Sequence, residues 1–474
     1  MTNGATASLL DAFERALDEI LVRVSVSAPS SIAVAYSGGL DSSVLLHLAH
    51  RYAALHGLAL FAFHIHHGIS LNADDWLAHC ERECAKLGAR FDAAKVTLND
   101  PGSGGIEQAA RISRYAALGE LCRRHGTPLL LTAHHLDDQA ETVLLQLLRG
   151  SGIAGLSGME NANTASDLLG DPNLMVGRPL LGARRAELEQ FAVANKILHI
   201  EDESNLDTRY ARNALRHKVM PALTLHFPGF QERFARAAQH AQAAQRVLNE
   251  VAALDLAACK EGDCIDIGKL KEFSSDRIDN LLRHWFASIG VRMPSTAWLS
   301  EMRVQLFEAK EDAQLRVTHP DCEIRRYRNK VFVTPRLDDA AHRLPPSSFR
   351  WSGEAWMDFP AYGGRLYFEP AKEGIDAAWL RQQDLLIRYR SGGEKLKPAP
   401  NRPTKPLKYH YQALSIPAWE RLRLPLVCTS FGQLLFAAGI GVNWRDLHAG
   451  VGPCIRLRWE AADAYESAPN FQRL

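Results

Sequence analysis

The sequence lacks the segments that would place it in a membrane or in an oxidising compartment. No uninterrupted apolar run approaches the roughly 20 residues that a membrane-spanning helix needs. The first residues, "MTNGATASLLDAFERALDEI", carry acids where a signal peptide would carry basic and then apolar side chains. The 8 cysteines are scattered, and no CxxC pair occurs. We therefore expect a cytoplasmic protein with reduced, mostly structural thiols and no membrane partner.

The sequence also lacks internal repeats, low-complexity tracts and a large net charge. A net charge of +1 over the whole chain does not indicate nucleic-acid binding, so the local distribution of charge must decide that question. At 474 residues the chain is too long for one ordinary core. Helix-rich and turn-rich stretches predict a first domain at 1–227, a connector helix and middle domain at 228–335, a linker at 336–370 and a C-terminal domain at 371–474.

The N-terminal part of the chain alternates between strand-like and helix-like patterns. This βαβα order predicts an α/β fold with a doubly wound parallel sheet. We expect a long helix from Pro228, then a small, mostly helical middle domain and a small α+β C-terminal domain. The predicted strands are Ser31–Tyr36, Leu58–His66, Phe91–Leu98 and Leu129–Ala133, and the predicted helices are Ser42–His56, Ala73–Leu87, Gly105–Arg124 and Asp138–Arg149.

Polar clusters follow three of the predicted strands. They are "SGGLDS" (Ser37–Ser42), "HIHHG" (His64–Gly68) and "HHLDD" (His134–Asp138). In open parallel sheets, ligands bind outside the carboxyl ends of the strands. We therefore expect the three clusters to converge on one site.

The first cluster has the chemistry of a phosphate-binding loop. It consists of Ser37, Gly38, Gly39, Leu40, Asp41 and Ser42. Its glycines permit positive φ and close backbone approach, and the following helix N-terminus attracts anions. No Lys follows, so this is not a Walker A motif. Asp41 would repel a phosphate unless a cation bridged them, which predicts Mg²⁺ at Asp41. The plainer alternative is a tight turn capped by Asp41.

SGGLDS after an apolar strand resembles the pyrophosphate-binding loop of the ATP pyrophosphatase (PP-loop) family. Further stretches closely resemble the tRNA(Ile)-lysidine synthetase family, in the order in which that family has them. They are "GIEQAARISRYAAL", "TAHHLDDQAETVLLQLLRGSGIAGLSGM", "RPLLGARRAEL", "EDESNLDTRYARNALRHKVMPAL", "RIDNLLRHWFASIGVRMPS" and "LLIRYRSGGEKLKPAPNRPTKPLKYHYQALSIPAWERLRLPLV". One departure is His66, which stands where that family is expected to have an acidic or amide residue.

The resemblance implies a specific ligase reaction. ATP would adenylate the C2 carbonyl oxygen of the wobble cytidine in CAU-anticodon tRNA(Ile), and the ε-amine of free lysine would then displace AMP. The implied co-substrate is ATP with Mg²⁺, the implied partners are tRNA(Ile) and lysine, and a homodimer is possible. The lysine amine has a pKa of about 10.4 and therefore needs a group that accepts its proton.

Acidic residues beside the loop are candidates for that role. Asp138 is the predicted proton acceptor, with Asp137 as the alternative and His135 close to the reacting groups. Both Asp residues could instead cap the helix that follows. Glu141 extends the cluster and could hold the metal or the lysine amine.

Four further residues are candidate ligands for substrate groups. Glu107 and Arg111 lie four residues apart on one predicted helix and could form only a surface ion pair. The resemblance makes Arg111 a ligand for a substrate carboxylate or phosphate, and Arg212 and Asn213 could serve the same site or a tRNA phosphate.

The C-terminal segment concentrates basic residues with aromatic residues beside them. Basic groups neutralise phosphates and aromatic faces stack bases, so we expect tRNA binding here. The alternative is a solvated charged loop with core aromatics. The predicted tRNA ligands are Arg388, Arg390, Lys395, Lys397, Lys405 and Lys408, and the neighbouring aromatics include Tyr389, Tyr409, Tyr411 and Trp419.

Two other enzyme classes compete with this interpretation. The histidine and aspartate residues at the strand ends could ligate metals in a hydrolase. A tRNA thiolase would share the ATP loop but use paired cysteines, and the absence of CxxC argues against it.

Overall fold

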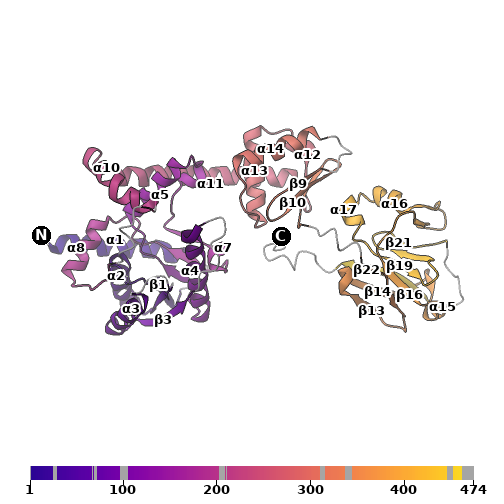
Figure 1. Cartoon of the computed structure of the whole chain (residues 1–474), viewed down its shortest axis with the longest axis horizontal. Coiled ribbons are helices and arrows are strands. Elements are labelled where there is room, and N and C mark those ends of the chain that lie inside the picture. Colours follow the sequence, from indigo (N-terminus) through magenta and orange to yellow (C-terminus); the bar gives the residue numbers. More distant parts are fainter. Residues whose placement is uncertain are drawn as a thin grey trace. The chain divides into compact units, whose positions relative to one another are not determined.

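The computed structural model describes residues 2–24, 29–66, 68, 72–96, 105–201, 209, 211–309, 315–336, 344–445 and 452–461. Within these ranges, the side chains of residues 2–7, 105–108 and 167 are not described. The chain divides into two compact units, Met1–Val247 and Leu248–Leu474 (Figure 1). None of the described helices is both long and apolar enough to cross a bilayer.

Unit 1 is built on a six-stranded sheet with the strand order β3-β2-β1-β4-β6-β5. All neighbouring pairs in it are parallel except β5 with β6, which is antiparallel. This confirms the predicted parallel sheet. The strands are β1 Ser31–Ala35, β2 Ala59–His66, β3 Arg90–Lys95, β4 Leu129–Leu131, β5 Ala162–Thr164 and β6 Met175–Gly177.

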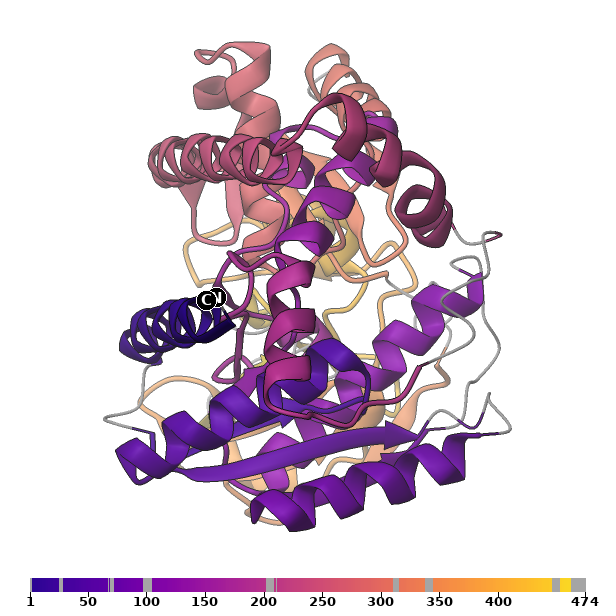
Figure 2. The same cartoon turned by 90° about the vertical axis from the view of Figure 1, so that its left-hand side faces the viewer.

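Helices cover both faces of this sheet, because the apolar residues of each strand point alternately to either side. Ile32 and Val34 of β1 pack with residues of α1, α2, α3 and α8. Ala33, between them, packs with residues of α4 and α7 on the other face. Figure 2 turns this unit toward the viewer. The helices are α1 Thr2–Val22, α2 Leu40–His56, α3 Ala73–Leu87, α4 Gly105–Arg124, α5 Leu136–Leu148, α6 Ile153–Leu156, α7 Ser166–Leu169 and α8 Arg185–Ala194.

Local chemistry explains where these helices begin and end. Both α2 and α3 end at a glycine in the left-handed region, Gly57 with φ 66° and Gly88 with φ 70°. Helix α5 begins two residues before the predicted Asp138, because His135 and Asp138 form a capping box around its first turn. The predicted bounds of α3 and α4 are confirmed.

A run of helices leads out of the sheet. A π-helical segment lies between two short α-helices, and the long helix predicted from Pro228 begins at Phe230. That helix continues across the division between the units. The elements are α9 Ala211–Ala214, η3 Leu215–Val219, α10 Met220–His226 and α11 Phe230–Cys259.

The first part of unit 2 packs three helices with a five-stranded antiparallel sheet, in the order β7-β8-β11-β10-β9. Serine side chains cap α13 and α14, as Ser274 accepts from Arg277 N–H and Ser295 from Trp298 N–H. The helices were predicted and the sheet was not. The elements are β7 Lys260–Glu261, β8 Cys264–Asp266, α12 Ile267–Leu270, α13 Ser275–Ser288, α14 Thr296–Glu308, β9 Arg316–Thr318, β10 Glu323–Tyr327 and β11 Lys330–Thr334.

The last part of unit 2 contains a five-stranded sheet, β12-β16-β19-β20-β21, a four-stranded sheet, β13-β14-β22-β15, and a small two-stranded one, β17-β18. The elements are β12 Ser347–Phe349, β13 Trp356–Phe359, η5 Pro360–Tyr362, β14 Gly364–Ala371, β15 Ile375–Asp376, α15 Ala377–Arg381, β16 Leu385–Arg388, β17 Lys395–Leu396, β18 Lys405–Pro406, α16 Leu407–Ala413, α17 Ala418–Arg421, β19 Leu426–Thr429, β20 Leu434–Ala437, β21 Gly441–Val442 and β22 Cys454–Ala461.

Three of these strands lie within 336–370, the segment predicted as a linker, or extend just beyond it. Strand β14 pairs along its whole length with β22, from Gly364 opposite Ala461 to Ala371 opposite Cys454. Leu366 and Phe368 of β14 are buried with residues of the C-terminal sheets. The turn residues around 345–355 therefore connect strands of one core.

Candidate active site

The SGGLDS loop joins β1 to α2 in a tight turn. Gly38 has φ +86°, and a Cβ atom there would lie 2.8 Å from Sγ of Cys80 and 2.9 Å from Cδ1 of Ile200. Ile200 N–H donates to the Gly38 carbonyl at 2.9 Å, which holds the loop against the segment after α8. Position 38 requires glycine, because a side chain there would meet both an unfavourable positive φ and the side chains of Cys80 and Ile200.

The loop presents backbone amides and hydroxyls at the start of α2. The hydroxyls of Ser37 and Ser42 lie 3.0 Å apart, and Ser42 donates to the Gly39 carbonyl at 3.0 Å. The first amides of a helix have no acceptor within it, and they carry the positive end of its dipole. This arrangement suits a phosphate group.

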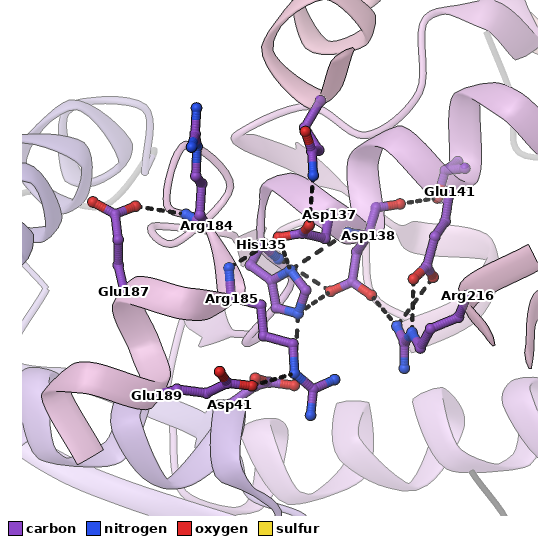
Figure 3. Close-up of polar contacts among 12 residues, drawn as sticks. Asp41, His135, Asp137, Asp138, Glu141, Arg184, Arg185, Glu187, Glu189 and Arg216 are labelled. Carbon is purple, nitrogen blue, oxygen red and sulfur yellow. Dashed lines mark hydrogen bonds and ion pairs between the residues drawn. The ribbon is translucent and has the colours of Figure 1, made fainter. Parts of the chain in front are cut away.

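His135 connects the loop to the acidic cluster on α5 (Figure 3). Its ring is buried, with 1% of the side chain exposed, and its Nε2 lies 3.4 Å from Oδ2 of Asp138 and 3.7 Å from Oδ2 of Asp41. Its Nδ1 lies 3.7 Å from Oδ2 of Asp137. Two of the three predicted strand-end clusters therefore meet at this imidazole.

Three carboxylates control the protonation of His135. Burial lowers its pKa, but the nearby negative charges of Asp138, Asp41 and Asp137 outweigh burial and raise the pKa above its ordinary value. The imidazole therefore favours its cationic form in this site more than a histidine in water does. In that form both ring nitrogens are donors, so protonation would break the half of the capping box in which Nδ1 accepts from the Asp138 N–H at 3.4 Å.

Asp137 and Asp138 have different surroundings. Oδ2 of Asp137 accepts from the Arg185 N–H at 2.9 Å, at the N-terminus of α8, and Oδ1 accepts from Nε2 of Gln231 at 3.3 Å. Asp138 is more deeply buried, and its Oδ2 accepts from the His135 N–H at 3.1 Å. Asp138 thus realises the capping alternative on its own helix, whereas Asp137 accepts from the first residue of a different helix, α8.

Asp138 and Glu141 face two guanidinium groups. Oδ1 of Asp138 accepts from Nη2 of Arg212 at 3.0 Å and from Nη2 of Arg216 at 3.1 Å. Glu141 accepts from Nε of Arg212 at 2.8 Å and from Nε of Arg216 at 2.7 Å. Burial opposes ionisation of Asp138, but the charges of His135 and Arg212 outweigh it and lower the pKa of this carboxyl. Sequence reasoning missed Arg216, although its spacing of four residues from Arg212 was a usable signal.

Asp41 keeps one carboxylate oxygen for a ligand. Within the described residues, its buried Oδ1 has no hydrogen-bond partner. A buried carboxylate oxygen without a partner is costly unless a cation or a donor joins it. No group of three or more His, Cys, Asp or Glu side chains in the described part of the chain could hold a metal by itself. Asp41 therefore fits a cation that takes its other ligands from a bound phosphate, as Mg²⁺ commonly does.

The remaining sequence candidates of unit 1 make other contacts. The Arg111 guanidinium on α4 lies 5.1 Å from the Tyr115 ring centroid. Asn213 is half-buried beside Arg212 on α9. His66 ends β2, and its Nε2 lies 3.1 Å from Oδ1 of Asp74. The side chain of Glu107 lies outside the described residues.

The predicted tRNA ligands of unit 2 differ in their exposure to solvent and in whether they are already paired. Lys395, Lys405 and Lys408 are exposed, whereas Arg390 and Lys397 are half-buried. Nη1 of Arg388 donates to Glu394 at 2.9 Å. Burial opposes the charge of Glu394, but amide donors and Arg388 outweigh it and lower its pKa to about 2. Arg388 is thus engaged within its own loop.

Most of the neighbouring aromatics belong to the core. Tyr411 is fully buried, with its hydroxyl donating to the Ala438 carbonyl at 3.0 Å, and Trp419 is 8% exposed. Tyr389 is half-buried against Tyr362. Tyr409 is 60% exposed and is the one of these four rings with an open face.

Family models match three successive parts of the chain. A PP-loop domain matches residues 9–223, a TilS substrate binding domain matches 265–332, and a TilS substrate C-terminal domain matches 385–459. A solved structure described as the TilS C-terminal domain matches with a TM-score of 0.21 and 23% identity, covering 25% of this chain and 100% of that chain.

Curated relatives match most of the chain. The tRNA(Ile)-lysidine synthase of Burkholderia pseudomallei is 43% identical over 90% of this chain and 93% of its own length. The tRNA(Ile)-lysidine synthase of Ralstonia nicotianae is 41% identical over 89% of this chain and 91% of its own. With a phosphate loop and an acidic cluster joined at His135, and with relatives this similar over this length, the chain belongs to the tRNA(Ile)-lysidine synthase family, the ATP-dependent ligases of the PP-loop class.

Proposed function

We propose that this enzyme joins free L-lysine to C2 of the wobble cytidine in CAU-anticodon tRNA(Ile). The C2 carbonyl oxygen attacks the α-phosphorus of ATP, which forms an O–P bond and releases pyrophosphate. The lysine ε-nitrogen then attacks C2, the C–O bond breaks, and AMP leaves. The product, lysidine, pairs with A, so codon recognition changes from AUG to AUA. The similarity to tRNA(Ile)-lysidine synthases across all three matched segments carries this proposal.

The SGGLDS loop supports binding of the ATP phosphates. Gly38 and Gly39 allow the backbone to approach a polyphosphate closely, and Ser37 and Ser42 can donate hydroxyls. Asp41 would hold Mg²⁺ through its unpartnered Oδ1, and the ion would neutralise phosphate charge. His135, with its raised pKa, would offer a second positive charge beside the phosphates.

Asp138 is the group that we propose to accept the proton from the lysine amine. Both carboxylates are hydrogen-bonded, but Oδ1 of Asp138 accepts from the cationic groups of Arg212 and Arg216, whose place an ammonium can take. The oxygens of Asp137 accept from neutral donors, the Arg185 N–H at the start of α8 and Gln231. The lowered pKa keeps Asp138 anionic, so it attracts the ammonium first and takes its proton only as the C–N bond forms. Glu141 would hold the same ammonium from the other side.

Exposed basic residues of unit 2 would hold the tRNA away from the anticodon, on its acceptor-stem side. Lys395, Lys405 and Lys408 have the exposure that phosphate contacts need. Arg111 and Asn213 would contact substrate groups in the catalytic domain. The domain boundaries given above and a homodimer remain predictions.

Reconstitution tests the proposal. The purified chain is incubated with ATP, Mg²⁺, lysine and unmodified CAU-anticodon tRNA(Ile), and the nucleosides are weighed by mass spectrometry after digestion. We expect a cytidine heavier by lysine minus water, formed only when both ATP and lysine are present. An unmodified tRNA in the presence of folded protein would contradict the proposal.

A further inference from the structure

We propose that Arg216 occupies the lysine-ammonium site in the substrate-free enzyme, and that a substrate phosphate must draw its guanidinium away before lysine binds tightly. The inference rests on the proposed function, because it takes Asp138 and Glu141 as the carboxylates that receive the ammonium. It adds a role for Arg216 and an order to substrate binding.

The carboxylates of Asp138 and Glu141 already accept hydrogen bonds from two guanidinium groups. Arg216 donates from Nε to Oε1 of Glu141 at 2.7 Å and from Nη2 to Oε2 at 3.0 Å. The same Nη2 reaches Oδ1 of Asp138 at 3.1 Å. Arg212 contacts the same pair of carboxylates from α9. Figure 3 shows Arg216 between the oxygens of Glu141 and Asp138.

The charges of these four side chains cancel, and His135 lies beside them between Asp138, Asp41 and Asp137. Asp138 and Glu141 supply two negative charges, and Arg212 and Arg216 supply two positive ones. Only 2% of the Glu141 side chain and 12% of the Asp138 side chain are exposed, so solvent screens this site weakly. A lysine ammonium entering the intact cluster would be a third cation facing two carboxylates. One guanidinium must therefore leave before the ammonium is held well.

The local backbone makes Arg216 the group suited to leave. Exposure does not separate the two arginines, since 27% of the Arg216 side chain and 32% of the Arg212 side chain are exposed. Arg216 lies on the π-helical segment Leu215–Val219, and single π-helical turns in proteins often occur at functional sites. A guanidinium exchanges a carboxylate for a phosphate readily, because its paired N–H groups match both.

The phosphate that attracts Arg216 can come from ATP or from the tRNA backbone. Either source adds negative charge close to Asp41 and His135, which face the same cluster. By linkage, a phosphate that removes Arg216 raises lysine affinity by the factor by which lysine raises phosphate affinity. The enzyme would thereby bind lysine tightly only when a substrate to be modified is present.

The test is equilibrium dialysis of radiolabelled lysine with the full-length chain. We expect the variant Arg216→Gln, without ATP or tRNA, to bind lysine at least tenfold more tightly than the unsubstituted enzyme. With the phosphate-bearing substrate present, we expect the two proteins to differ by less than threefold. Arg216→Lys, which keeps the charge but loses the two-pronged geometry, should lie between them and serves if Arg216→Gln does not fold.

Arg458→Gln is the matched control. Arg458 is also an arginine that bridges two carboxylates, Glu369 and Glu460, but it lies on β22 in unit 2. Its substitution should leave lysine affinity unchanged. Tenfold tightening in both variants would point to a general charge effect and overturn the proposal, as would unchanged or weaker binding by Arg216→Gln.

Separate additions identify the source of the phosphate. A non-hydrolysable ATP analogue with Mg²⁺ that raises lysine affinity of the unsubstituted enzyme assigns the role to ATP, and unmodified tRNA alone assigns it to RNA. If neither addition raises lysine affinity, the proposal is wrong. Should the unsubstituted enzyme form lysidine while Arg216→Gln binds lysine no more tightly, this inference fails and the proposed function stands.

Discussion

Asp41, in the first turn of α2, and His135, the N-cap of α5, follow two neighbouring strands, and Nε2 of His135 is 3.7 Å from Oδ2 of Asp41. The contact joins the phosphate loop to the acidic cluster of α5. Three carboxylates raise the pKa of His135 against the effect of burial, so a change in charge at the loop also changes the protonation of the imidazole beside Asp138. The two halves of the proposed reaction are thus coupled through one imidazole.

Substituting Asp41 should disable ATP chemistry without unfolding the chain. We expect Asp41→Ala to lower the rate of pyrophosphate release roughly 10²- to 10³-fold, the scale on which a preorganised charge-stabilising group contributes. Pyrophosphate release with saturating tRNA and lysine is the measurement. Asp75→Asn is the control, since Asp75 is an exposed aspartate in the first turn of α3. A loss below threefold in Asp41→Ala would mean that the loop is only a turn.

Alanine should destabilise the protein more at position 38 than at Gly88, a glycine with a similar positive φ. Gly88 has φ +70° and nothing within 4 Å of an added Cβ, so Gly88→Ala tests backbone strain alone, roughly 1–2 kcal/mol. Gly38→Ala adds contacts of 2.8 Å with Cys80 and 2.9 Å with Ile200. We expect a larger drop in Tm for Gly38→Ala, together with lost ATP turnover. Equal decreases in Tm for the two variants, measured by calorimetry, would show that Cys80 and Ile200 move aside at little cost.

The convergence of the strand ends was predictable, because parallel strands bring their carboxyl ends to one edge of the sheet. Asp41, His135 and Asp138 therefore lie together although loops and helices separate them in the chain. The capping of α5 by Asp138 was foreseen only as an alternative to catalysis, and the capping role of His135 was not foreseen. In the structure the capping contacts use Oδ2 of Asp138, while Oδ1 faces the arginines.

Other features depend on contacts that periodicity does not encode. Arg216 reaches Glu141 from a π-helical segment, and sequence patterns do not specify that geometry. Tyr411 and Tyr409 stand two residues apart in a basic stretch, yet one is buried and the other is 60% exposed. Arg388 has the charge and the N–H donors of a phosphate ligand, but in the structure it donates to Glu394. Tertiary packing decides such cases.

The titration of His135 should show the influence of its carboxylates. Its raised pKa predicts an NMR titration midpoint above the ordinary value of about 6.5, whereas burial should hold the midpoint of His64 below it. The folded state then binds a proton at His135 that the unfolded chain releases, so this stabilisation is complete below pH of about 6.5. It is lost as pH rises through the folded-state pKa.

Comparison with His135→Gln isolates this stabilisation. The difference in free energy of unfolding between the two proteins should shrink as the pH rises through that range. His64→Gln should alter the pH dependence only below the ordinary histidine pKa, because its shift has the opposite sign. A His135 midpoint at or below 6.5 would contradict the arrangement of charges described here.

Substitution of basic residues in the C-terminal domain should either weaken tRNA binding or lower the Tm, depending on the residue. Lys405 is exposed on β18 with room for a phosphate, so Lys405→Gln should weaken tRNA binding and reduce the slope of log affinity against log salt by about 1. Arg388 is paired with Glu394, so Arg388→Gln should instead lower the Tm. Removing it leaves a carboxylate that is only 8% exposed without its charged partner.

Filter binding at several salt concentrations, together with calorimetry of the same variants, distinguishes the two outcomes. Lys86→Gln is the control for Lys405, because Lys86 is an exposed lysine already paired with Glu83 on α3. If Arg388→Gln reduced the salt slope as much as Lys405→Gln and left the Tm unchanged, the pairing with Glu394 would have to open when tRNA binds. In that case Arg388 would be a phosphate ligand, as the sequence alone predicts.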